Sequence, residues 1–227
     1  MNKKITLYHG SNRIIRVPQY GVGNPYNDYG MGFYCTQSLD LVKEWAVNDD
    51  CDGYANEYTL AMEDLSVLNL KQENYNILHW LTILLQNRLF DVQSDFGEEA
   101  KQYLIRYFDI QYPQYDVIIG YRADDSYFSF AQDFLNNAIS LSVLSSAMRL
   151  GKLGEQIVLK SQRAFEHISF QRAIFAEASI WQPQKLERDT RARRDYFESR
   201  KVPWKKREIY MMQILEEEIR ADDARLR

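Results

Sequence analysis

The chain has 227 residues, of which 45% are hydrophobic, so it is long enough to bury one substantial core. Its net charge of −4 and pI of about 5.5 exclude a global basic field for nucleic acid or an acidic membrane, so such a partner must be held locally. The two cysteines are too few for a disulfide framework, and the N-terminus leads into a strand without an apolar signal region. We therefore expect a cytoplasmic protein.

The most apolar stretch, residues 77–90, does not have the features of a membrane span. It contains His79, Asn87 and Arg88 and is shorter than the roughly 20 residues that a span needs. We expect it to be a helix packed on the core, and we expect no membrane partner.

In the first half of the chain, short strands alternate with helices. Strands are predicted at residues 6–9, 32–36, 54–60 and 67–70, and a helix is predicted at residues 40–47. Residues 71–115 then form a predicted helical insertion, because apolar side chains recur at helical spacing in residues 74–90 and 98–108.

The second half returns to strands and then ends in a tail. Strands are predicted at residues 116–120 and 156–160, with helices at residues 128–136 and 141–150 between them. Ser140 is the predicted N-cap of the second helix and Gly151 its predicted stop. All ten glycines lie at or before Gly154, which favours a mostly helical extension at residues 166–227 after a domain of residues 1–165. The predicted fold class is α+β.

Positive charge gathers in the tail. Residues 185–207 hold ten Lys/Arg against four Asp/Glu, a net of +6, while residues 1–184 hold 15 against 22, a net of −7. One interpretation is a solvated helix whose basic face docks against the acidic body. The other is a surface for an antitoxin or a nucleic-acid acceptor, with Arg191, Arg193 and Arg194 facing that partner.

Three short segments, far apart in the sequence, supply groups suited to a nucleotide site. Residues 8–11 read Tyr-His-Gly-Ser, residues 30–36 read Gly-Met-Gly-Phe-Tyr-Cys-Thr, with Trp45 downstream, and residues 154–159 read Gly-Glu-Gln-Ile-Val-Leu. They offer a polar group for a ribose, aromatic faces for a flat ring and a carboxylate where positive charge develops. Cleavage of a glycosidic bond to a cationic nicotinamide needs all three.

With these motifs in this order, residues 5–160 resemble the ADP-ribosyltransferase superfamily. The resemblance is to its His-Tyr-Glu branch, which contains diphtheria toxin and the poly(ADP-ribose) polymerases, and within it to a bacterial toxin-like family of unknown function. It implies a split two-sheet core that holds NAD in a cleft between the sheets, with the helical insertion and the helical tail as additions.

The resemblance also implies roles for the residues of the first two motifs. His9 would bind the adenosine-side ribose, while the backbone of Gly10 and the hydroxyl of Ser11 would bind the nicotinamide carboxamide. Tyr34 and Trp45 would stack on the two faces of the nicotinamide ring. The structural alternatives are a satisfied histidine at a strand end and two aromatic rings of the core.

Glu155 is the predicted catalytic carboxylate, acting with His9 and Tyr34. As nicotinamide leaves, the ribose C1 approaches an oxocarbenium ion, which a carboxylate stabilises while it accepts a hydrogen bond from the ribose 2′-hydroxyl. The alternative is a solvated glutamate at the start of a strand. Gln156 points to the opposite face of that strand, so a shift of one residue in register would place an amide in the site and imply a weak or altered activity.

A charged loop at residues 121–128 follows a predicted strand end, where loops often border active sites. Arg122 is predicted to pair with the NAD pyrophosphate, and Asp124 or Asp125 to orient the acceptor nucleophile. The alternatives are an internal ion pair for Arg122 and a helix cap at Asp125 or Ser126. No Cys/His/Asp cluster has metal-ligand spacing, so no metal is expected.

The sequence therefore predicts an NAD-dependent ADP-ribosyltransferase, with NAD as substrate and a protein or nucleic acid as the macromolecular acceptor. Toxin-like members of the superfamily are often held in check by a small partner, so the resemblance also implies an antitoxin. Two alternatives stay open: a non-catalytic module that binds NAD or a nucleotide, and an NAD glycohydrolase whose acceptor is water.

Overall fold

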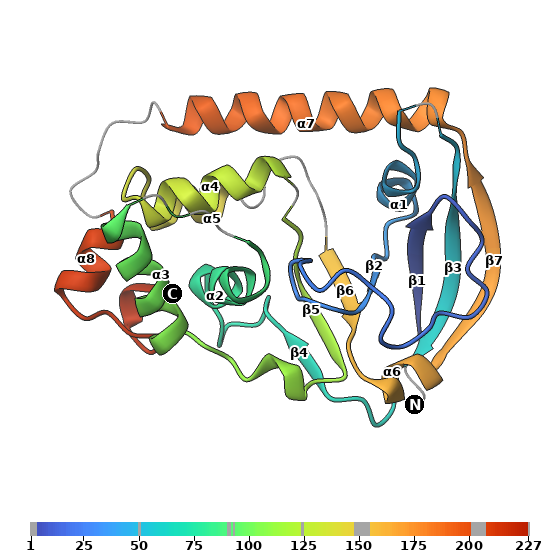
Figure 1. Ribbon diagram of the computed structural model, residues 1–227, viewed down its shortest axis with the longest axis horizontal. Helices are drawn as coiled ribbons and strands as arrows, with labels where there is room; N and C mark the ends of the chain where they lie inside the picture. The colour runs from blue at the N-terminus through green and yellow to red at the C-terminus, as the bar shows by residue number, and fades with distance from the viewer. Residues whose placement is uncertain are drawn as a thin grey trace.

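Seven strands form two small sheets in the computed structural model, which describes residues 4–49, 51–89, 92, 94–123, 125–147, 155–200 and 208–226 (Figure 1). Sheet A is antiparallel and has the order β1 (Lys4–Ser11), β3 (Gly53–Ala61), β7 (Ile168–Ala176). Sheet B has the order β2 (Phe33–Cys35), β6 (Glu155–Leu159), β5 (Val117–Tyr121), β4 (Val67–Asn69), and its β4 and β5 are parallel.

In the described residues, one isolated β-bridge connects the two sheets, and apolar side chains pack between them. The backbone N–H of Tyr8 donates to the carbonyl of Thr36 at 2.8 Å, and the N–H of Thr36 donates to the carbonyl of Tyr8 at 2.9 Å. Apolar side chains from both sheets fill the space between them, since alternate residues of each strand point to one face. The largest of these buried residues include Leu7, Phe33, Tyr58, Leu60, Ile157 and Leu159.

Helices of the insertion and the second half cover the other face of sheet B (Figure 1). They are α2 (Ile77–Asn87), α3 (Asp95–Tyr107), α4 (Asp125–Leu135) and α5 (Leu141–Ala147). Every residue of α2 from Ile77 to Leu85 is buried, which explains its continuous apolar sequence. In the described part of the chain, no helix combines the length and apolar character needed to cross a membrane.

The remaining helices are α1 (Leu39–Ala46), α6 (Gln162–Glu166) and the helices of the C-terminal part. The first, α1, packs on sheet A, and its start is capped by Ser38, whose Oγ accepts from the N–H of Leu41 at 3.3 Å. Short α6 links β6 to β7. The C-terminal part holds α7 (Ala178–Arg200), α8 (Met211–Glu216) and a 3-10 turn at Ala224–Leu226, and another 3-10 turn lies at Tyr112–Gln114.

The mixed α+β fold expected from the sequence is confirmed, and so are the two helices of the insertion. The tail differs from its prediction in one respect: residues 168–176 form β7, the outer strand of sheet A, instead of a helix. A bulge between Glu57 and Tyr58 shifts the register against β7, so the strand lacks a regular alternation of apolar residues. Ser140 does cap α5, because its Oγ accepts from the N–H of Val143, whereas Gly151 lies outside the described residues.

The tail belongs to the core of the fold. Ala192 and Tyr196 of α7 and Met211 and Ile214 of α8 are buried in the same apolar cluster as α2, α3, α4 and α5. The predicted boundary between residues 165 and 166 therefore separates neither the sheets nor the core of the molecule.

Candidate functional site

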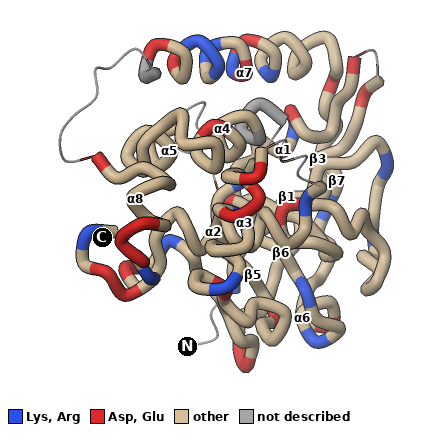
Figure 2. The backbone as a smooth tube through the Cα atoms, turned by 60° about the vertical axis from the view of Figure 1, so that its left-hand side comes forward, with Lys and Arg blue, Asp and Glu red and all other residues tan. Residues whose placement is uncertain are grey.

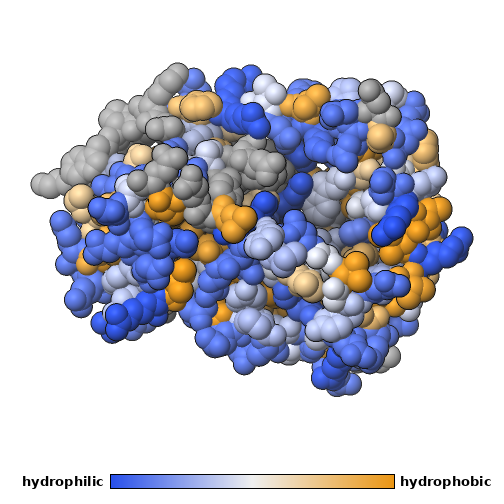
Figure 3. Space-filling model, viewed as in Figure 1, coloured by the Kyte–Doolittle hydropathy of each residue, from blue (hydrophilic) through white to orange (hydrophobic). Residues whose placement is uncertain are grey.

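A cleft of about 1230 Å³ lies where sheet A, sheet B and α7 meet. Its walls come from the end of β1, the irregular segment 12–32, β2, α1, the residues after β5, the start of β6 and α7. The face seen in Figure 3 is hollowed beneath α7, and hydrophilic residues border the hollow. A cleft of this size accommodates a ligand as large as a dinucleotide.

His9 lies on the cleft at the end of β1. Its Nδ1 is 2.7 Å from the carbonyl oxygen of Tyr34, and its ring stacks on Phe33 with 4.2 Å between ring centroids. Because a carbonyl can only accept, Nδ1 carries the proton and Nε2 remains as an acceptor. Burial lowers the pKa of His9 and so favours this neutral form.

Gly10 lines the cleft, and it also allows α1 to pack against β1. A Cβ at this position would lie 2.6 Å from the carbonyl oxygen of Val42 and 2.9 Å from the backbone nitrogen of Ala46. The absence of a side chain is therefore required by the packing of α1, whatever binds in the cleft. Ser11 follows on the rim, where its Oγ accepts from the N–H of Arg13 at 3.3 Å.

Tyr34 presents its ring to the cleft from β2, while its hydroxyl is used inside the protein. The hydroxyl donates to the carbonyl of Gly30 at 2.5 Å and accepts from the N–H of Tyr29 at 3.0 Å. Gly30 has a φ of +71°, which favours glycine, and its tight turn brings this carbonyl within reach. Burial raises the pKa of Tyr34, so the hydroxyl keeps its proton.

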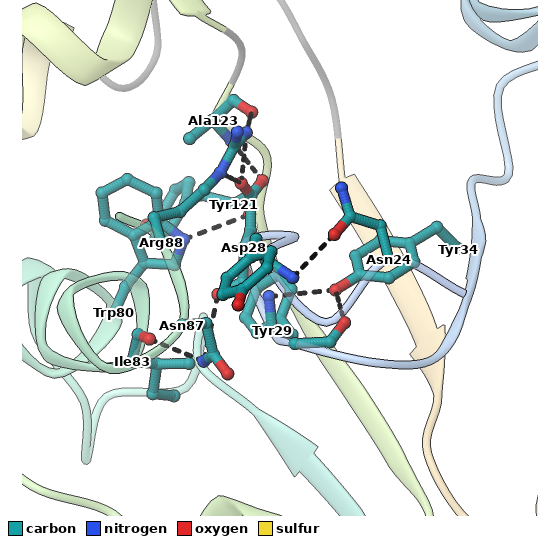
Figure 4. A network of polar contacts seen from close by, with 12 residues as sticks. Asn24, Asp28, Tyr29, Tyr34, Trp80, Ile83, Asn87, Arg88, Tyr121 and Ala123 are labelled. Atoms are coloured by element: carbon teal, nitrogen blue, oxygen red, sulfur yellow. Dashed lines mark hydrogen bonds and ion pairs between the residues drawn. The ribbon is translucent and has the colours of Figure 1, made fainter. Parts of the chain in front are cut away.

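The turn before β2 is tied to the end of β5, as Figure 4 shows. Buried Asp28 accepts from Nε of Arg88 at 2.9 Å and from the N–H of Ala123 at 2.8 Å. The hydroxyl of Tyr29 donates to the carbonyl of Tyr121 at 2.6 Å. Burial raises the pKa of Asp28, and the ion pair with Arg88 opposes that shift.

A lysine completes the support of this turn. Nζ of Lys160 donates to the carbonyls of Tyr29 and Met31, each at 2.5 Å. Burial lowers the pKa of Lys160 to about 8. Together with Asp28, these contacts fix the positions of Tyr34 and of the chain around Arg122 on the cleft.

Trp45 and Arg122 meet on the cleft from different elements. The guanidinium of Arg122, which follows β5, lies 4.4 Å from the centroid of the Trp45 ring on α1. This cation–π contact occupies one face of the indole, so one face at most is open to a ligand. The side chains of Asp125 and Ser126 and the whole of Asp124 lie outside the described residues.

At the start of β6, the structure places Gln156 on the cleft and Glu155 away from it. Tyr34 of β2 pairs directly with Val158 of β6, and paired residues of an antiparallel ladder point to the same face. Gln156, two residues before Val158, therefore shares the face of Tyr34, while Glu155 points to the other. Glu155 forms an ion pair with Lys71 at 2.8 Å.

The sequence-predicted residues are therefore largely brought together. His9, Gly10, Ser11, Tyr34, Trp45 and Arg122 line one cleft, and Glu155 does not. Side chains from α7, which sequence reasoning assigned to the tail, line it as well: Lys185, Arg188, Asp189 and Arg193. Their helical spacing places them on one side of α7 and is the signal that could have identified them. Arg191 pairs with Glu187 on the opposite side, at 2.6 Å.

Two properties of the cleft suit a polar, anionic ligand. Seven Lys/Arg and two Asp line it, although the whole chain has a net charge of −4. Buried polar atoms without a hydrogen-bond partner in the described residues gather there: Nε1 of Trp45, Oε1 of Gln156 and Nε of Arg188. Such atoms are rare in folded proteins, so water or a bound molecule must complete the hydrogen bonding of this cluster on the cleft. Within the described ranges, no group of three or more His, Cys, Asp or Glu could hold a metal ion.

A family model described as "Protein of unknown function (DUF3990)" matches residues 5–170. The chain belongs to this family. No curated protein and no solved structure matches it significantly. The DUF3990 region contains both sheets except Lys4 of β1 and residues 171–176 of β7, and it contains His9, Tyr34, Trp45 and Gln156. It ends before α7, so one wall of the cleft is built from residues beyond the DUF3990 match.

Proposed function

We propose that the protein binds NAD in this cleft and transfers the ADP-ribose portion to a macromolecule. The observation that carries the proposal is that His9, Tyr34, Trp45 and Gln156, from four different elements, line a single cleft. The proposal assigns the fold to the ADP-ribosyltransferase type, with the two small sheets on either side of the ligand.

Each of these side chains has a function toward NAD. The rings of Tyr34 and Trp45 offer flat surfaces to the nicotinamide ring, which attract it while it is cationic. Nε2 of His9 accepts a hydrogen bond from a ribose hydroxyl. Oε1 of Gln156, buried and without a partner in the described residues, accepts from the other ribose.

In the proposed reaction, the bond between the ribose C1 and the nicotinamide nitrogen breaks, and its electron pair leaves with neutral nicotinamide. An oxygen or nitrogen of the acceptor then bonds to C1 and releases a proton. The amide dipole of Gln156 stabilises the positive charge on the ribose, although a neutral dipole does so less strongly than a carboxylate. We therefore expect slow turnover.

The neutral amide also favours a second candidate, a non-catalytic module that binds NAD without breaking it. Among the described residues that line the cleft, both carboxylates form ion pairs: Asp28 with Arg88 at 2.9 Å and Asp189 with Arg188 at 3.2 Å. In this second candidate, the same residues bind NAD, and the protein acts as a sensor that responds to whether NAD is bound in the cleft.

Incubation of the full chain with NAD separates the candidates. We expect release of nicotinamide, measured by chromatography, and transfer of labelled ADP-ribose to cell protein or nucleic acid. Free ADP-ribose as the sole second product would identify a glycohydrolase. Saturable binding by calorimetry without any release would support the non-catalytic module and contradict the transferase.

Variants of β6 test the assignment of the amide. Gln156→Ala should lower nicotinamide release by about tenfold or more, because it removes the acceptor and dipole on the cleft. Glu155→Gln is the matched control, since this side chain points away from the cleft and pairs with Lys71. Loss of release in Glu155→Gln, with Gln156→Ala active, would contradict the assignment.

A further inference from the structure

The wall of the cleft that lies beyond the family region is cationic. Lys185, Arg188, Asp189 and Arg193 occupy one side of α7 and line the cleft. Arg191 and Arg194 occupy the opposite side and are exposed. Figure 2 shows that Lys and Arg alternate with Asp and Glu along this helix. The cationic residues of α7 therefore lie on two sides of the helix, one facing the cleft and the other facing solvent.

Contacts at both ends hold α7 across the cleft. At one end, Nζ of Lys43 on α1 lies 4.5 Å from the centroid of the Trp181 ring. At the other, Tyr196 packs on Phe130 of α4 with 3.6 Å between ring centroids, and its hydroxyl donates to Asp133 at 2.5 Å. Figure 1 shows the helix running from above α1 to above α4. Its central residues are therefore held in fixed positions over the cleft.

A buried ion pair fixes the centre of the helix. Arg188 lies 2.7 Å from Glu44 of α1, the neighbour of Trp45, and both side chains are at most 15% exposed. Asp189 lies 3.2 Å from the same guanidinium. These carboxylates hold Arg188 in place, while its Nε has no hydrogen-bond partner in the described residues. Lys185, one turn earlier, and Arg193, one turn later, lie on the same wall.

We propose that α7 is the phosphate-binding wall of the cleft, in which Lys185, Arg193 and Nε of Arg188 bind the diphosphate of a dinucleotide. This inference rests on the proposed function, because it takes the bases and riboses to lie against the two sheets. Hydrogen bonds between charged donors and phosphate oxygens are about twice as strong as neutral ones. A helix held at both ends also loses little backbone freedom when the ligand binds, so the ordering cost is confined to the side chains.

The test compares a ligand with phosphates and a ligand without them. Binding of ADP-ribose and of nicotinamide riboside to the full chain is measured by calorimetry for wild type, Lys185→Ala and Arg193→Ala. We expect Kd for ADP-ribose to rise about tenfold in each variant, and further in the double variant, which corresponds to one charge-assisted hydrogen bond per side chain. Kd for nicotinamide riboside should stay within about twofold of wild type.

Arg191→Ala is the matched control, because it removes a cation from the solvent side of the same helix. It should leave both affinities unchanged. Arg188→Ala would leave Glu44 buried without its partner, so it is made only together with Glu44→Gln. Thermal melting verifies the fold of each variant. If the variant that combines Arg188→Ala with Glu44→Gln fails to fold, Lys185→Ala still tests the proposal.

The results distinguish the wall from the transferase. Unchanged ADP-ribose affinity in both Lys185→Ala and Arg193→Ala, or an equal loss for nicotinamide riboside, overturns the phosphate wall. If wild type binds ADP-ribose with this dependence but never releases nicotinamide from NAD, the wall stands and the transferase fails. If the variants release nicotinamide at an unchanged KM, the transferase stands and the wall fails.

Discussion

At the scale of single residues, one step along β6 decides which functional group reaches the cleft. The sequence run Ile-Val-Leu at residues 157–159 is apolar on both faces, since sheet B is covered by the helices on one face and by sheet A on the other. A strand buried on both faces lacks the alternation of polar and apolar residues that would show which side chains point to which face. Glu155 and Gln156 could therefore not be separated from the sequence, and the pairing of Tyr34 with Val158 separates them.

Other residues of the site were predictable because a local motif constrains them. The Tyr-His-Gly-Ser segment at the end of β1 and the Gly-x-Gly turn before β2 indicated His9, Gly10 and Tyr34, all of which line the cleft. Arg188 and Lys185 had no such motif. Helical spacing places both on one side of α7, but which surface that side faces depends on how α7 packs on α1, a long-range contact that composition and periodicity do not encode.

His9 gives the cleft a predictable pH dependence. Burial lowers the pKa of His9 below its usual value near 6.5, so the ring is neutral at pH 7 and its Nε2 accepts a hydrogen bond. Protonation converts Nε2 into a donor. We expect Kd for NAD to rise from its value at pH 7 as the pH falls through the lowered pKa of His9, which lies below 6.5, measured by calorimetry at constant ionic strength.

His9→Asn is the control for this prediction, and it should bind NAD more weakly with a flatter pH profile. A profile that persists in His9→Asn would instead belong to Asp28 or Glu44, whose pKa values are raised by burial. Stability cannot substitute for binding as the readout. Burial lowers the pKa values of both His9 and His79, so the unfolded chain takes up these protons more readily and the free energy of unfolding falls below pH 6.5 for both.

At the scale of elements, the positions of helices were predicted better than their ends. The insertion helices match α2 and α3, whose starts are set by the side chains of Asn76 and Ser94, which accept backbone N–H bonds. Strand β7 was missed because a bulge breaks its alternation and because β3, the strand with which it pairs, is distant in sequence. A glycine-free composition distinguishes a helix from an edge strand poorly, since strands disfavour glycine as well.

The contact between α1 and β1 allows a prediction at Gly10. A Cβ there would meet backbone atoms of Val42 and Ala46, which cannot rotate away, so Gly10→Ala must displace α1. We expect a loss of about 1–3 kcal/mol in the free energy of unfolding, measured by urea denaturation. NAD affinity should fall too, because α1 carries Trp45.

Ser11→Ala, one residue along on the half-buried rim, adds no bulk and should leave the free energy of unfolding within about 0.5 kcal/mol of wild type. If Gly10→Ala were as stable as Ser11→Ala, the close approach of α1 to β1 would be disproved.

At the scale of the whole molecule, the C-terminal segment both completes the core and closes the cleft. A chain that ends at Pro183 would contain the residues of both sheets but lack the part of α7 that lines the cleft, together with α8. It would also remove buried apolar residues from the main cluster: Ala192, Tyr196, Met211, Ile214, Ile219 and Leu226. Each large apolar side chain contributes about 1.5–3 kcal/mol when fully buried, and a domain of ordinary stability has about 5–15 kcal/mol in total.

The sum of these losses is comparable to the entire stability of the protein, so we expect residues 1–183 not to unfold cooperatively by circular dichroism, whereas the full chain should melt in one transition. Addition of a separate peptide covering residues 184–227 should restore part of the transition, since the missing surface is then supplied in trans. Arg191→Glu with Arg194→Glu in the full chain is the control for charge, because these side chains face solvent and contribute nothing to the core. A soluble 1–183 chain that melts cooperatively within a few degrees of the full chain would show that α7 and α8 are an appendage, and the wall that α7 forms on the cleft would then be dispensable for folding.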